Sequence, residues 1–201
     1  MSVIEYENDN IRIRYLDGFR RGPRFPRELD GNEAYVKVPG RRISAAAYHH
    51  SAGGFYRGIT AVEKLASYCT AAPTYKVDDA GEPVLNSKGH RIVVGGGRGW
   101  PGIPYTYVIP AYPDLEDGRL VIYKIWHDDW VTWHTGGIYN HHAVGVVVAG
   151  WYASRHDLLS GKDSSARDRP TVEAMTAADE LADYLMVRHG LRMGPDTLKC
   201  H

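Results

Sequence analysis

The segment AVGVVVAGWY at residues 143–152 is the most apolar stretch of the chain. Its four valines favour a β-strand buried in the core, because β-branched side chains pack well on a pleated sheet. The ten residues of this segment are far too few to cross a bilayer, which takes about 20 in a helix. We therefore expect a core strand here and no membrane span.

Strand and helix patterns alternate on both sides of this segment. The run RISAAAYHHS at 42–51 consists largely of small residues and precedes two glycines, which predicts a second buried strand. Further strands are predicted at 104–110 and 119–126, and helices at 60–72 and 171–189. Interleaved strands and helices are typical of an α/β (α+β) fold, in which helices flank a central mixed β-sheet.

The second helix has the clearest boundaries, because Pro170 precedes it and Gly190 follows it. Helical spacing predicts an apolar face made of Val172, Met175, Ala178, Leu181, Ala182 and Leu185. We expect a hairpin excursion between 74 and 99 and a charged loop at 155–169. Residues 1–40, with a short strand at 11–15, are expected to form an N-terminal arm packed on a domain that spans 41–201.

Composition excludes several classes of protein. The 201 residues suit one domain, and 24 basic against 24 acidic residues argue against a dedicated nucleic-acid binder. Two cysteines cannot build a disulfide framework. The N-terminus lacks a basic start followed by an apolar stretch, so we expect synthesis in the cytoplasm without a signal peptide.

His49 and His50 end the predicted strand at 42–51. Adjacent strand residues point to opposite faces, so only one of the two can face a given pocket. A histidine at a strand end can bind a metal or act as a base, and neutral imidazole is the usual nitrogen ligand of zinc. The alternative is a histidine pair that is merely hydrogen-bonded at a loop.

Two other segments place polar residues beside predicted strands. WHTGGIYNHH at 133–142 is a loop with three histidines, and loops on rigid strands commonly carry binding residues. A hairpin turn with solvated histidines would have the same pattern. RGWPGIPY at 98–105 leads into a strand that begins at Tyr105, whose phenol could stabilise an oxyanion or simply pack in the core.

The order of these motifs resembles the zinc-dependent N-acetylmuramoyl-L-alanine amidases, which include phage amidase endolysins and peptidoglycan recognition proteins. The resemblance covers residues 43–201, from YHHSAGG through RGWPGIPYTYVI and WHTGGIYNHHAVGVVVAGWY to a long helix and LKCH. It implies the amidase fold, a mixed sheet flanked by helices. It also implies Zn²⁺ as the cofactor.

The resemblance implies a role for each matching residue. His49 matches the first zinc ligand and His201 the second. His50 matches the second position of the family's histidine pair, beside the substrate and not on the metal. Tyr105 matches a tyrosine that helps to polarise the scissile carbonyl. The substrate groove is expected to be flanked by Trp100, His134 and Asn140.

The implied function is hydrolysis of the amide bond between N-acetylmuramic acid and L-alanine in peptidoglycan, as in a phage endolysin that acts on the cell wall after release. The expected partner is peptidoglycan or a muropeptide, with no nucleic acid or membrane, and the expected state is a monomer. The family places a third ligand, Cys or Asp, after the position of His201, so we expect a domain truncated at its C-terminal end. Two alternatives stay open: a non-catalytic peptidoglycan-binding module and a cytosolic muropeptide-recycling amidase.

Overall fold

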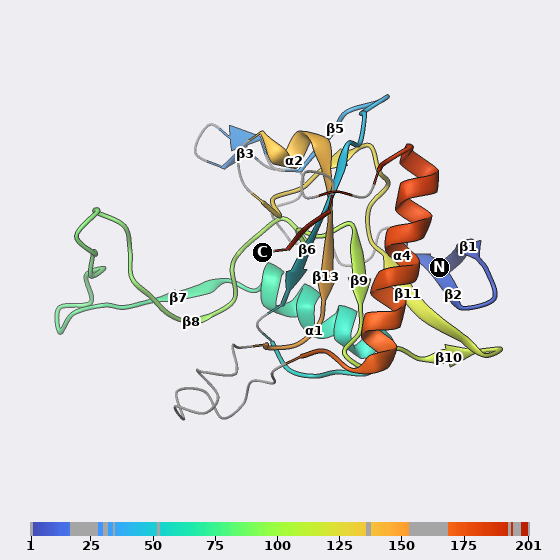
Figure 1. Cartoon of the computed structure of the whole chain (residues 1–201). Helices are drawn as coiled ribbons and strands as arrows, with labels where there is room; N and C mark the ends of the chain where they lie inside the picture. Colours follow the sequence, from blue (N-terminus) through green and yellow to red (C-terminus); the bar gives the residue numbers. More distant parts are fainter. Residues whose placement is uncertain are drawn as a thin grey trace.

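The computed structural model describes residues 2–16, 28–29, 32–33, 35–51, 53–135, 138–152, 169–192, 194 and 198–200. Its centre is an eight-stranded mixed sheet, which the helices α1 (Gly58–Thr70) and α4 (Val172–His189) cover on opposite faces (Figure 1). The strand order is β1 (Ser2–Glu7), β2 (Ile11–Leu16), β11 (Arg119–Lys124), β9 (Tyr107–Ile109), β13 (Ala143–Val148), β6 (Ala45–His50) and β14 (Leu198–Cys200), with β10 (Leu115–Glu116) beside β11. This is the predicted mixed sheet flanked by helices.

Strand β13 lies at the centre of the sheet, between β9 and β6, and is parallel to both. All six of its residues are buried. Val144, Val146 and Val148 pack in the core beneath α4, whereas Val147 packs in the core beneath α1. A strand that is covered on both faces has a continuous run of apolar residues in its sequence. The core strand predicted at this segment is therefore confirmed.

Helix α4 begins and ends where the sequence predicts, and it buries the predicted Leu181, Ala182 and Leu185 but not the predicted Val172 and Met175. Thr171 caps it by accepting a hydrogen bond from the Ala174 amide at 3.2 Å, and Gly190 ends it at a positive φ of 63°. Val172 and Met175, which were expected in the core, are 78% and 47% exposed. The small side chains of Ala174 and Ala177 contact the sheet instead, together with Leu181 and Leu185.

The N-terminal residues contribute more than an arm packed on the domain. Strands β1 and β2 form an antiparallel hairpin, and β2 extends the central sheet by pairing in parallel with β11. The fully buried Lys124 of β11 joins the hairpin to the rest of the domain. Its Nζ atom lies 2.6 Å from a carboxylate oxygen of Glu5 in β1 and 2.8 Å from one of Asp128.

The remaining elements lie outside the central sheet. Strands β7 (Pro73–Tyr75) and β8 (Val93–Gly96) form the base of the predicted hairpin excursion, which projects from the domain in Figure 1. Two short ribbons pair β3 (Glu28–Leu29) with β4 (Asn32–Glu33), and β5 (Val36–Lys37) with β12 (Trp130–Val131). Apart from Arg169, the charged loop expected at 155–169 lies outside the described residues. Among the helices described, none has the length and apolar character needed to span a membrane.

Candidate active site

His49 and His50 point to opposite faces of β6. The His49 ring lies on the α1 face, with its centroid 5.2 Å from that of Tyr105 and 5.9 Å from that of His134. His50 lies on the other face, where its exposed ring has its centroid 6.2 Å from that of Tyr152. Strand alternation therefore separates the pair, and only His49 joins the other two residues.

Tyr105 stands just before β9 and packs against the core beneath α1. The neighbouring Thr106 amide donates a 2.8 Å hydrogen bond to the Gly145 carbonyl of β13, which fixes this segment to the central strand. Burial raises the pKa of the Tyr105 phenol to about 12. The phenol therefore keeps its proton at neutral pH and is a hydrogen-bond donor beside His49.

His134 is buried, with 8% of its surface exposed, and its orientation is fixed by the backbone of β13. Its Nε2–H group donates a 2.9 Å hydrogen bond to the Ala143 carbonyl, because a carbonyl can only accept. The neutral ring therefore carries its lone pair on Nδ1. Gly145 makes room for this ring, since a Cβ atom there would lie 2.6 Å from His134 Cγ.

Asn140 holds the loop that carries His134. It lies in the one-turn helix α2 (Tyr139–His142) and is 7% exposed. Its Oδ1 atom accepts hydrogen bonds from the backbone amides of His134 at 3.1 Å and Thr135 at 2.9 Å, and from the Thr135 hydroxyl at 3.0 Å. These contacts give Asn140 a role in positioning the loop.

Arg41 belongs to the same arrangement and was not found by the sequence analysis. Its five N–H groups all donate to backbone carbonyls, which belong to Asp128, Trp130, Asn140, His141 and Ala143. The Ala143 carbonyl thus accepts from both Arg41 and His134. Burial lowers the Arg41 pKa to about 10, which still leaves the guanidinium charged at neutral pH. An arginine that binds carbonyls leaves no periodic or motif signal in a sequence.

Two further residues complete the surroundings. Ser51 joins the ends of β6 and β13, because its Oγ atom accepts a 2.9 Å hydrogen bond from the Gly150 amide. Trp100 is half-buried at the C-terminal end of α1, where its amide donates to the Cys69 carbonyl at 2.8 Å. The Arg98 guanidinium lies 5.6 Å from the centroid of the Trp100 ring.

Comparison with known proteins identifies the family of this chain. Residues 39–201 match the sequence profile of the family described as N-acetylmuramoyl-L-alanine amidase. The chain belongs to this amidase family. No curated protein sequence matches it.

The chain is similar to two solved structures. The Drosophila peptidoglycan recognition protein SD is 18% identical, with a TM-score of 0.50 over 85% of this chain and 75% of that one. The endolysin amidase LysCS from Clostridium intestinale URNW is 18% identical, with a TM-score of 0.49 over 96% of this chain and 84% of that one. The likeness to the recognition protein confirms the predicted fold class.

Amidases of this family are generally zinc-dependent, so we asked whether the residues fit a zinc site. His49 offers an imidazole, the nitrogen ligand that suits zinc, and Tyr105 and His134 lie beside it. The described residues contain no group of three or more His, Cys, Asp or Glu side chains that could hold a metal. His201, the second ligand implied by the resemblance, lies outside them. The described part of the chain thus supplies one residue, His49, that fits as a zinc ligand.

Proposed function

We propose that this protein hydrolyses the amide bond between N-acetylmuramic acid and L-alanine in peptidoglycan. One observation carries the proposal: His49, Tyr105 and His134 converge on one face of the sheet, within the residues that match the amidase profile. An imidazole, a protonated phenol and a buried second imidazole are groups that metal-assisted amide hydrolysis uses.

The proposed zinc ligands are His49 and His201. Strands β14 and β6 pair in parallel with Cys200 opposite Tyr48, and in the sequence a histidine follows each of these two residues. This relation in the sequence supports His49 and His201 as the pair that would hold the metal. When bound, zinc would polarise the scissile carbonyl and lower the pKa of a coordinated water to ~7.

The other residues of the site bind the substrate or hold neighbouring side chains in position. The Tyr105 phenol donates a hydrogen bond to the carbonyl oxygen of the scissile amide as negative charge develops there, an interaction typically worth about 3 to 4 kcal/mol. His134 packs beside His49 and limits the positions that its ring can adopt. Asn140 and Arg41 hold the loop and the carbonyl that fix His134. Trp100 is a proposed contact of the substrate, whereas the ring of His50 lies on the opposite face of β6, away from His49 and Tyr105.

The proposal is tested by measuring new L-alanine amino groups after zinc-loaded protein acts on purified peptidoglycan. Tyr105→Phe removes one hydroxyl and should lower kcat by about 10²–10³ while zinc content stays the same, because the phenol stabilises charge without binding the metal. Tyr75→Phe, in the exposed excursion, is the matched control and should leave kcat unchanged.

Two outcomes separate this function from its rivals. A wild-type protein that binds peptidoglycan but releases no amino groups in the presence of zinc would be a binding module and not an amidase. We further propose that the substrate is the cell wall itself, as for an endolysin. Release from soluble muropeptides without release from intact walls would contradict that part and favour a recycling enzyme.

A further inference from the structure

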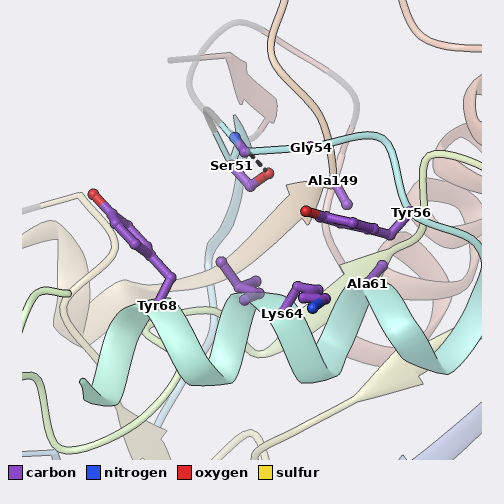
Figure 2. Close-up of a pocket in the computed structure, with 9 residues that line it drawn as sticks. Ser51, Gly54, Tyr56, Ala61, Lys64, Tyr68 and Ala149 are labelled. Carbon is purple, nitrogen blue, oxygen red and sulfur yellow. Dashed lines mark hydrogen bonds between the residues drawn. The ribbon is translucent and has the colours of Figure 1, made fainter. Parts of the chain in front are cut away.

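A pocket of about 270 Å³ lies between helix α1 and the loop that follows β6. Its walls include Ser51, Gly54, Tyr56, Lys64, Leu65 and Tyr68. Figure 2 shows the Tyr56 and Tyr68 rings on opposite sides of the pocket, with Lys64 between them on α1. Gly54 leaves space for the Tyr56 ring, because a Cβ atom there would lie 2.7 Å from the ring carbons.

This pocket lies next to the candidate active site. Ser51 follows His49 by two residues, and side chains two apart along an extended chain share a face. Leu65, which lines the pocket, belongs to the core cluster against which Tyr105 packs. A ligand held at His49 and Tyr105 can therefore extend into the pocket.

The pocket carries positive charge. Lys64 is the one charged residue among the described residues that line it, and its ammonium lies 5.9 Å from the centroid of the Tyr56 ring. A second cation, the Arg98 guanidinium, lies 5.6 Å from the centroid of the Tyr68 ring, and the Arg98 amide donates to the Tyr68 carbonyl at 3.0 Å. These contacts with aromatic rings position both cations without neutralising them.

We propose that Lys64 binds a free carboxylate of the peptidoglycan stem peptide, namely the one on the second residue. This inference rests on the proposed function, which places the scissile bond at His49 and Tyr105. Two residues of extended strand, from His49 to Ser51, span about 7 Å. The second stem residue follows the L-alanine directly, so its carboxylate lies within about 7 Å of the scissile amide. The Ser51 wall of the pocket and the carboxylate therefore lie at similar distances from the bond.

The test measures binding by calorimetry in EDTA, so that no metal or turnover enters the result. The two probes are N-acetylmuramoyl-L-alanyl-D-glutamate and N-acetylmuramoyl-L-alanyl-D-isoglutamine, which differ by one carboxylate against one carboxamide. We expect the wild-type protein to bind the glutamate probe about five-fold more tightly, the scale of an exposed ion pair. The preference should decrease at high salt, because ions screen exposed charges.

Three variants assign the preference to Lys64. Lys64→Gln should bind both probes equally, and Lys64→Arg should keep the preference because it keeps the charge. Lys88→Gln, which removes the same charge from an exposed turn of the excursion, should behave like the wild type. Equal binding of the two probes by the wild type, a preference that survives in Lys64→Gln, or no binding of either probe at millimolar concentration would each overturn the inference.

Amide hydrolysis is measured in a separate experiment from probe binding, and its result tests the proposed amidase function. Release of L-alanine amino groups from purified peptidoglycan, together with equal binding of the two probes, would overturn the role of Lys64 alone. A glutamate preference that depends on Lys64, without any release in the presence of zinc, would overturn the amidase and leave the carboxylate site intact.

Discussion

The two faces of the central sheet are built from the same strands but differ in the types of side chain that they carry. Beneath α4 the core is mainly aliphatic, with Tyr107 and Tyr184 as its buried aromatic residues, and the alanines of that helix contact the sheet closely. Beneath α1 the core is rich in aromatic residues, and His49, Tyr105 and His134 gather at its edge, next to a pocket. Apart from the ion pairs of Lys124 and Asp128, which lie on the α4 face, the polar groups with a proposed role in catalysis lie on the α1 face. The following predictions test this division, from the largest expected effect to the smallest.

The strongest test replaces each of the two histidines of β6 with alanine in turn, because their rings lie on opposite faces of the sheet. His49→Ala should abolish zinc binding and amidase activity, because it removes a proposed ligand from the α1 face. His50→Ala should keep the metal, since its ring lies against Tyr152 on the other face. Metal analysis of both purified variants measures this. A metal-free His50→Ala protein would contradict the assignment.

A substitution beneath α4 should affect stability alone. Leu181 is fully buried against the sheet, so Leu181→Ala should lower the free energy of unfolding by about 2–5 kcal/mol. Denaturant titration measures the loss, with the 87% exposed Val187→Ala on the same helix as the control. The folded fraction of Leu181→Ala should keep its kcat. A ten-fold decrease in kcat would mean that the two faces are not independent.

The packing of His134 on β13 gives a test within the α1 face. Gly145→Ala would place a Cβ atom 2.6 Å from His134 Cγ, so the imidazole must move away from its position beside His49. We expect kcat/KM to decrease by about 10- to 100-fold, the effect of a displacement of roughly 1 Å near the reacting groups. Gly95→Ala is the control, because its Cβ atom would meet only a Thr74 carbon, at 3.9 Å. Unchanged kinetics in Gly145→Ala would remove His134 from the site.

The smallest effect concerns the buried ion pairs at the edge of the sheet. Lys124, Arg188 and His189 surround Asp128 and hold the pKa of its carboxyl well below the usual value, despite the opposing effect of burial. A depressed pKa in the folded state means that the stabilisation is complete above the unfolded value of about 3.9 and decreases as the pH falls below it. Unfolding measured between pH 7 and pH 3 should therefore lose less stability in Asp128→Asn than in the wild type. Parallel pH profiles would show that Asp128 is not coupled to these neighbours.

The sequence predicts the elements of this fold better than it predicts their packing. The core strand at 143–148 and the limits of α4 follow from local patterns: a run of valines, a proline before the helix and a glycine after it. The buried face of α4 was predicted only in part. Leu181, Ala182 and Leu185 are buried as predicted, but the small Ala174 and Ala177, which allow close approach, take the places expected for Val172 and Met175. The hairpin of β1 and β2 was assigned to an arm, since pairing between β2 and β11 joins residues that are far apart in the chain.

The same distinction holds for the candidate site. The motifs around His49, Tyr105 and His134 were sufficient to indicate the amidase family, because each motif is local and their order is fixed by the chain. Their convergence on one face is decided by the parallel pairing of β6 and β13, whose register also sends His50 to the opposite face. Arg41 and Lys64 became visible only in the folded structure. The Arg41 guanidinium binds five backbone carbonyls, and the Lys64 ammonium lies near the Tyr56 ring. Only tertiary packing brings these groups together.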